Sequence, residues 1–167
     1  MARRTRISLG LGLAALVLVL DQISKALVLG APVLQDGGSV TLVPGILNAV
    51  FTWNLGITFG MFRYSFAWLV LIPIALAVIA ALLVWLLRAE HVRIACAVGA
   101  ILGGALGNVA DRVRYGKVVD FLHLHLGAFD PFPYIFNVGD SAIVLGVATL
   151  LLDMALSGSK QANVAQK

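Results

Sequence analysis

The sequence predicts an all-α polytopic membrane protein with four transmembrane helices and a small β-strand segment on the outer face, between the first two helices. Three observations support this fold class. Of the 167 residues, 60% are hydrophobic and 12% are charged, whereas soluble domains average about 25% charged residues. A soluble domain of this length buries only about two thirds of the surface that its unfolded chain exposes, which is too little to hide so many hydrophobic side chains from water. Four apolar runs approach the roughly 20 residues that a spanning helix needs. A soluble globular enzyme, a disordered protein and a disulfide scaffold are therefore excluded.

The expected spans are residues 7–29, 66–87, 94–109 and 138–156 of one membrane-embedded domain, 1–167. The first span follows three arginines, and its start has the length of the apolar region of a secretory signal peptide. More apolar sequence follows this start, and three further spans lie downstream, so we interpret it as a retained helix. The Ser, Gly, Gln and Lys content of residues 157–167 predicts a disordered tail.

The placement of Lys and Arg predicts the orientation, because cytoplasmic loops carry an excess of basic residues. With both termini cytoplasmic, that side holds seven basic residues: Arg3, Arg4, Arg6, Arg88, Arg93, Lys160 and Lys167. The opposite side holds four: Arg63, Arg112, Arg114 and Lys117. We therefore expect segments 30–65 and 110–137 on the outer, periplasmic side. The basic residues are scattered rather than clustered, which argues against a nucleic-acid partner.

The two outer segments contain strand signals. Residues 40–43 and 46–53 are rich in Val, Thr, Phe and Trp, and they flank Pro44 and Gly45, which suit the central positions of a type II turn. We expect this strand pair on the membrane surface, with Trp53 at the level of the headgroups. In the second outer segment, residues 118–126 are expected to form a short strand.

Charged side chains beside the spans are informative, because an ionisable group in hydrocarbon costs several kcal/mol. Asp21 and Lys25 lie in the outer half of the first span, four residues apart, so they share a helix face and can pair. The pair is either a neutralised anchor near the interface or the support of a functional site, and we favour the second interpretation.

The third span combines small residues with a polar end. Gly99, Gly103 and Gly107 repeat every four residues, a spacing that lets helices pack closely in lipid, and we interpret them as packing residues. The span then ends with polar residues at positions i, i+3 and i+4, which are Asn108, Asp111 and Arg112. They form either an interfacial ion pair or, as we expect, one polar face of a site.

Two further carboxylates occupy unusual places. Asn137 and Asp140 begin the fourth span as helix-capping residues, but capping does not require a carboxylate against hydrocarbon. Asp120 interrupts an apolar strand, where Asp is disfavoured. With Asn54, all these residues are expected at the outer membrane boundary. Two carboxylates held close together do not both ionise readily, so Asp120 and Asp140 can act as acid and base, activating water and protonating a leaving amine. This is aspartic peptidase chemistry.

Other chemistries fit the sequence less well. Ser24 and Lys25 are adjacent and diverge on a helix, and Cys96 has no nearby base. His123 and His125 could ligate a metal from one strand face, but no H-E-x-x-H motif accompanies them. We therefore predict no metal and no cofactor. The main alternative is a small proton-coupled carrier or channel subunit, which should place ionisable groups through the full membrane depth; the inner halves of the second and third spans hold none.

Five motifs in this order resemble the bacterial lipoprotein signal peptidase (signal peptidase II) family: residues 21–25, 54–60, 103–112, 118–121 and 136–140. The resemblance implies an aspartic endopeptidase of the bacterial inner membrane, with Asp120 and Asp140 as the catalytic pair. Such enzymes remove signal peptides from prolipoproteins and cut just before a cysteine that carries a diacylglyceryl group. The implied partners are this substrate and membrane lipid, and we expect a monomer. Globomycin, a cyclic peptide antibiotic, is the family's inhibitor.

The same resemblance assigns supporting roles. Substrate contact or orientation of the catalytic pair falls to Asn54, Asn108, Arg112 and Asn137, and support of the site falls to Asp21, Lys25, Gly56 and Asp111. The family's strand segment cradles the substrate and a short adjoining helix covers the site; here these are residues 38–53 and 54–63. The sequence departs from the family at Gly139 and Thr58, where Ala is common, and neither change puts the assignment in doubt.

Overall fold

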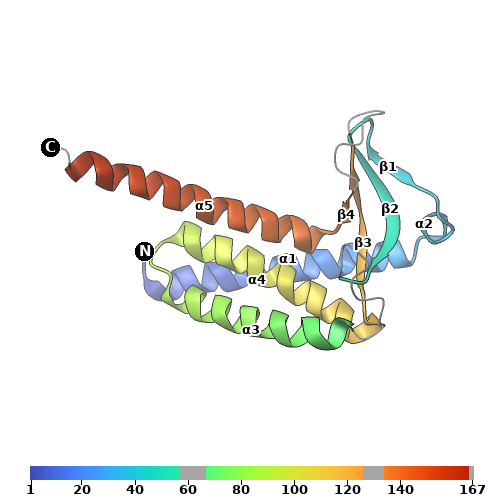
Figure 1. Ribbon diagram of the computed structural model, residues 1–167, viewed down its shortest axis with the longest axis horizontal. Helices are drawn as coiled ribbons and strands as arrows, with labels where there is room; N and C mark the ends of the chain where they lie inside the picture. The colour runs from blue at the N-terminus through green and yellow to red at the C-terminus, as the bar shows by residue number, and fades with distance from the viewer. Residues whose placement is uncertain (57–66, 126–133, 166–167) are drawn as a thin grey trace.

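A computed structural model describes residues 1–56, 67–125 and 134–165. Its four long helices are α1 (Arg3–Leu29), α3 (Ala67–Arg88), α4 (Val92–Tyr115) and α5 (Val138–Ala165), and each is long and apolar enough to cross a membrane. The helices run along roughly one direction, and a small sheet stands across one end of the bundle (Figure 1). The start of α1 and the C-terminal end of α5 lie at the opposite end. The fold class is confirmed, and the chain is a multi-pass membrane protein.

The helices extend beyond the apolar runs that predict them. The third span, expected over 94–109, is helix α4 from Val92 to Tyr115, so Asp111 and Arg112 belong to the helix and not to the outer segment. Gly116, at φ +71°, ends α4 in the left-handed conformation that favours glycine. Helix α5 continues to Ala165, so residues 157–165 are helical where composition predicts a disordered tail. Hydropathy marks only the stretch that crosses hydrocarbon, whereas backbone hydrogen bonding propagates readily into polar residues once a helix exists.

The strands form one antiparallel sheet in the order β1-β2-β3-β4. Strands β1 (Val40–Val43) and β2 (Leu47–Asn54) flank a turn in which Gly45 has a φ of +72°, as a type II turn requires. A short helix, α2 (Pro32–Gln35), precedes them. Strands β3 (Val118–Leu124) and β4 (Ile135–Phe136) come from the segment between α4 and α5. The sheet therefore joins both outer segments, which sequence reasoning treated separately.

Helix α4 is the centre of the bundle and packs against α1, α3 and α5. In the apolar 18-residue stretch of α4 that could span a membrane, 61% of residues are buried, against 22% or less in the corresponding stretches of the other three helices. Its glycines permit this packing. A Cβ atom at Gly99 would collide with the backbone of Gly10 in α1, and one at Gly104 would collide with the backbone of Gly139 in α5. The interpretation of the glycine series as packing residues is confirmed.

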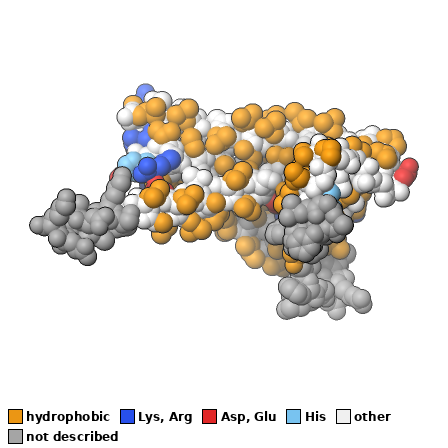
Figure 2. Space-filling model, turned by 90° about the horizontal axis from the view of Figure 1, so that it is seen from above, with side chains coloured by type: hydrophobic (Ala, Val, Ile, Leu, Met, Phe, Trp, Pro, Cys, Tyr) orange, Lys and Arg blue, Asp and Glu red, His pale blue; other side chains and the backbone are white. Residues whose placement is uncertain are grey.

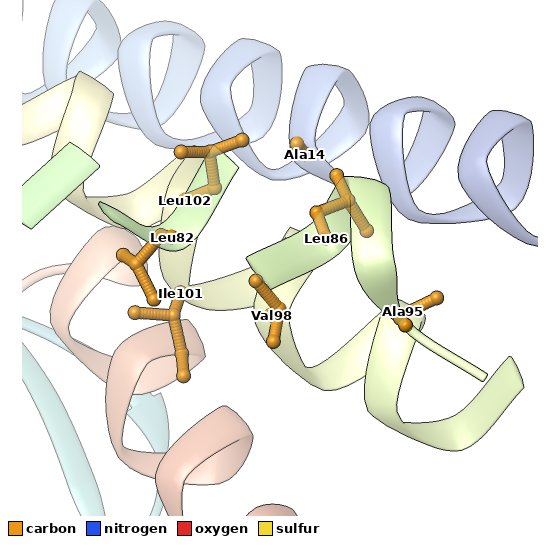
Figure 3. Close-up of a cluster of buried hydrophobic side chains, with 8 residues drawn as sticks. Ala14, Leu82, Leu86, Ala95, Val98, Ile101 and Leu102 are labelled. Carbon is orange, nitrogen blue, oxygen red and sulfur yellow. The ribbon is translucent and has the colours of Figure 1, made fainter. Parts of the chain in front are cut away.

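Two clusters of buried apolar side chains stabilise the two halves of the molecule. One lies between α1, α3 and α4 (Figure 3) and includes Ala14, Leu82, Leu86, Ala95, Val98, Ile101 and Leu102. The other lies under the sheet and consists of Val28, Leu34, Ala49, Val119 and Phe121. Elsewhere the helices present hydrophobic side chains outward along their length, and Lys and Arg side chains gather at the end opposite the sheet (Figure 2).

Candidate active site

Buried polar side chains gather at the sheet end of the bundle. Over the described residues, the buried charged or polar side chains are Asp21, Lys25, Asp111, Asp120 and Asn137, each at most 2% exposed. All five are among the residues that the sequence nominates for the site. Burial of a charge is costly unless it is paired and hydrogen-bonded. None of these buried charges lies in the inner half of the helices, where the carrier or channel alternative would need them.

Asp120 is held by two side-chain amides, one from β2 and one from the residue that precedes α5. It pairs with Thr52 in the register between β3 and β2. Its Oδ2 accepts a hydrogen bond of 2.8 Å from Asn54 Nδ2, and its Oδ1 accepts one of 2.6 Å from Asn137 Nδ2. Burial raises the pKa of Asp120 to about 6; the Asn54 hydrogen bond opposes this shift, and the charge of Asp140 adds to it.

Asp140 lies in the first turn of α5, where it also takes part in a cap. Its backbone N–H donates to Asn137 Oδ1 over 2.8 Å, and its Oδ2 accepts from the Asn137 backbone N–H over 3.3 Å. This reciprocal pattern is a capping box, so the predicted cap is present. Its Oδ1 accepts a hydrogen bond of 2.7 Å from Asn108 Nδ2. The Asp140 carboxylate therefore takes part in the cap of α5 and also forms part of the polar cluster.

Asn137 connects the two aspartates through one amide group. Its Oδ1 accepts from the backbone of Asp140, and its Nδ2 donates to Asp120 Oδ1. The Asn54 amide is oriented in a similar way, because Gly56 N donates to its Oδ1 over 2.7 Å and leaves Nδ2 for Asp120. Gly56 has a φ of +87°, a conformation that costs glycine little.

Arg112 supplies a cation to this cluster. Its Nη1 donates to the backbone oxygen of Asn108 over 3.2 Å, and its charge interacts with Asp140, Asp120 and Asp111.

A second layer of charges lies behind the aspartates. The Lys25 Nζ contacts Asp21 Oδ2 at 2.7 Å and Asp111 Oδ2 at 3.0 Å, and it donates to Asn108 Oδ1 over 3.0 Å. The predicted pairing of Asp21 with Lys25 is thus present, and Asp111 makes it a triad. The structure brings together all ten residues that the sequence nominates.

The signal peptidase II family model matches residues 13–156. The chain belongs to this family. It is 41% identical over 155 residues to the lipoprotein signal peptidase of Methylobacterium sp. (strain 4-46), covering 91% of this chain and 92% of that protein. It is 43% identical over 148 residues to that of Caulobacter vibrioides, covering 87% and 85%. A solved bacterial membrane enzyme is 25% identical, with a TM-score of 0.77 over 90% of each chain.

Sequence reasoning about this signal peptidase II family member missed two polar residues. Gln22 Nε2 contacts Asp111 Oδ1 at 3.0 Å and Asp21 Oδ2 at 3.2 Å. Its Oε1 accepts a hydrogen bond of 2.6 Å from Arg114 Nη1. Gln22 carries no charge, and Arg114 entered only the count of basic residues, so neither gave a signal. Their contacts join α1 to α4 across about 90 positions of sequence.

A cavity of about 400 Å³ opens beside the site of this peptidase. Its walls are mostly apolar, with Asp140 and Ser141 as the polar residues, and consist of Leu124, Phe136, Asp140, Ser141, Val144 and Leu145. Val144 and Leu145 are also largely exposed on the outer face of α5. The cavity therefore connects Asp140 with the exposed apolar face of α5.

His123 lies near the end of β3, and His125 follows the strand. The ring centroids of His123 and His125 are 5.8 Å apart. Among the described residues, no group of three or more His, Cys, Asp or Glu side chains could hold a metal ion. The absence of a metal stays a prediction. The short covering helix expected over 54–63 falls mostly on residues 57–66, which lie outside the described residues, as does Thr58.

Proposed function

We propose that this chain removes signal peptides from prolipoproteins by hydrolysing the peptide bond before a diacylglyceryl-modified cysteine, with Asp120 and Asp140 as its catalytic dyad. One observation carries the assignment of the dyad. Asn137 contacts both aspartates, one on a strand and one at a helix start: its Nδ2 donates to the Asp120 carboxylate, its backbone N–H donates to the Asp140 carboxylate, and its Oδ1 accepts from the Asp140 backbone N–H. Family membership and the names of the curated relatives support the substrate class.

We assign different starting protonation states to the two carboxylates. Burial raises the pKa of Asp120 to about 6, so Asp120 is the better holder of the shared proton. Asp140 lies in the first turn of α5. It also accepts a hydrogen bond from Asn108 and interacts with the Arg112 cation. In this proposal Asp140 begins the reaction as the base and Asp120 as the acid.

The reaction then follows general acid–base catalysis. Asp140 takes a proton from a water molecule while the water oxygen attacks the scissile carbonyl carbon. Asp120 gives its proton to the carbonyl oxygen, which produces a tetrahedral diol. Asp140 next gives its proton to the leaving nitrogen of the cysteine, the C–N bond breaks, and Asp120 recovers a proton from the diol. The products are a carboxyl group on the signal peptide and a free amine on the lipidated cysteine, and the dyad returns to its starting state.

The same proposal includes the location of the enzyme and its partners. Basic side chains at the end opposite the sheet support an inner-membrane protein with both termini in the cytoplasm and the dyad on the periplasmic side. Acyl chains of the substrate then remain in lipid while the scissile bond meets water at the boundary. We propose that the enzyme acts as a monomer without cofactor, and that globomycin blocks the dyad.

The deciding experiment is cleavage of a diacylglyceryl-modified prolipoprotein by the purified chain. We expect Asp120→Asn and Asp140→Asn each to lose at least about 100-fold in turnover, because each removes one proton-transfer group. Asp36→Asn is the matched control: Asp36 is an exposed carboxylate at the end of α2, and its replacement should leave turnover unchanged. Near-normal turnover by either dyad variant would show that the assignment is wrong. The unmodified precursor, assayed in parallel, tests the requirement for the lipid.

A further inference from the structure

The residue before each dyad aspartate donates a backbone hydrogen bond to a carboxylate on a helix, either α4 or α1. The backbone N–H of Val119, one residue before Asp120, donates to Asp111 Oδ2 over 3.1 Å. The backbone N–H of Gly139, one residue before Asp140, donates to Asp21 Oδ1 over 2.8 Å. Hydrogen bonds to a charged acceptor are about twice as strong as neutral ones. The carboxylates of Asp111 and Asp21 therefore hold strand β3 and the start of α5 at the residues next to the dyad.

Two side chains, Lys25 and Gln22, each connect the carboxylates of Asp21 and Asp111. The ammonium of Lys25 contacts both, at 2.7 Å from Asp21 and 3.0 Å from Asp111. The Gln22 amide nitrogen also contacts both, at 3.2 Å and 3.0 Å. Arg114 donates to the Gln22 oxygen, which settles the orientation of that amide and directs its nitrogen toward the carboxylates.

We propose that Lys25 and Gln22 are positioning residues that set the distance between the two dyad carboxylates. The proposal rests on the dyad assigned above. Asp120 belongs to β3 and Asp140 to α5, two elements that meet at the sheet end of the bundle (Figure 1). The path from β3 through Asp111, Lys25 or Gln22 and Asp21 to α5 is a continuous chain of hydrogen bonds and ion pairs. We call these four side chains, Asp21, Gln22, Lys25 and Asp111, the brace.

Lys25 also acts on the dyad by a second route. It donates to Asn108 Oδ1 over 3.0 Å, which leaves the Asn108 nitrogen to donate to Asp140 over 2.7 Å. Loss of the ammonium therefore has two effects. It frees the Asn108 amide to rotate, and it removes the ion pairs that hold the Asp21 and Asp111 carboxylates together. Both effects change the position or the hydrogen bonding of Asp140 without removing any group that touches the substrate.

Stability alone is a weak reason for such an arrangement. Well-packed apolar side chains in place of a buried ion pair often leave stability unchanged or higher, because burial of the charges costs as much as their attraction returns. A helix contact here needs no charges, since the glycine face of α4 already permits close packing with α1. We therefore attribute the buried charges to a need for accurate positioning of the dyad carboxylates, because misplacement of a reacting group by about 1 Å costs roughly 100-fold in rate.

The test compares Lys25→Met, Gln22→Met and the neutral triple variant Asp21→Asn/Lys25→Met/Asp111→Asn. We expect Lys25→Met to lower kcat roughly 100-fold with little change in KM, and Gln22→Met to lower it about 10-fold, the equivalent of one or two lost hydrogen bonds. In the triple variant, both Asn oxygens still accept the backbone N–H groups and no buried charge is unpaired. Its Tm should recover relative to Lys25→Met, while its kcat stays low.

Arg93→Met is the matched control, because it breaks the ion pair between Arg93 and Asp153 at the opposite end of the bundle; its kcat should be unchanged. A triple variant that regains kcat together with Tm would overturn the brace, as would Lys25→Met and Gln22→Met that lose only Tm. Gln22→Met changes no charge, so it tests the proposal even if Lys25→Met does not fold. Asp120→Asn and Asp140→Asn in the same assay separate the two proposals: if both lose turnover while the brace variants keep kcat, only the brace is wrong.

Discussion

Removal of the Asn54 amide should move the pH dependence of cleavage to higher pH. Asn54 Nδ2 donates to Asp120 Oδ2 over 2.8 Å, and this bond favours the ionised carboxylate. In Asn54→Ala the ionised form loses that stabilisation, so the pKa of Asp120 rises above its present value of about 6. A hydrogen bond to a charged group is worth roughly 1.5–3 kcal/mol, and one pKa unit is about 1.4 kcal/mol, so we expect a rise of about one to two units.

The assay is kcat/KM against pH, which reports ionisations of the free enzyme. The reaction needs Asp120 protonated, so activity should fall as pH rises through its pKa, near 6 in the unaltered chain and about one to two units higher in Asn54→Ala. Because the two carboxylates interact, the measured values belong to the dyad as a pair. An alkaline limb that stays in place or moves to lower pH would refute this reasoning.

Two further variants separate the pKa effect from damage to the loop. Asn54→Asp keeps an acceptor for the Gly56 N–H, which now donates to Asn54 Oδ1 over 2.7 Å. It also places a second negative charge beside Asp120, so the alkaline limb should again move to higher pH. Asn48→Ala is the matched control on the same strand, where Asn48 pairs with His123 rather than with Asp120. Its profile should match that of the unaltered chain.

Three other predictions concern packing, the cap and metals. Gly107→Ala places a methyl group on the Asp21 carboxylate; it should cost about 1–3 kcal/mol in unfolding free energy and lower kcat, whereas Gly12→Ala, with open space around it, should change neither. Asn137→Ser keeps a capping oxygen but loses the donor to Asp120, so helix content should persist while turnover falls at least about 100-fold. Chelators should leave cleavage unchanged; a loss restored by added metal would revive the metal hypothesis for His123 and His125.

The parts of the fold that depend on local patterns could be predicted from the sequence. The four spans, the turn at Gly45 and the cap at Asn137 each rest on hydropathy or on a residue's own backbone preference, and each is present. Helix ends were less accurate, since α4 passes through Asp111 and Arg112 before Gly116 stops it. Apolar runs report the thickness of the hydrocarbon layer, while a helix ends where its capping residues allow.

The site was predictable as a set of residues but not as a network. A charge is conspicuous in an apolar chain, and this is why Asp120 and Asp140 stood out. The contacts between them depend on which strand lies beside which, as in the register that brings Asn54 to Val118 at the start of β3. The bond from Gly139 to Asp21 spans 118 positions of sequence. No periodicity encodes such a pair, and an uncharged residue such as Gln22 gives no signal of its own.

Asn137 shows why an amide, rather than the commoner capping hydroxyl, stands at the start of α5. A cap needs only an acceptor, and the Asn137 oxygen fills this role for the Asp140 N–H. The site also needs a donor directed at a buried carboxylate, and the amide nitrogen supplies it to Asp120 over 2.6 Å. An amide carries both functions on one rigid plane. The geometry that begins the helix therefore also sets the orientation of one dyad carboxylate relative to the other, and the cap cannot shift without moving the site.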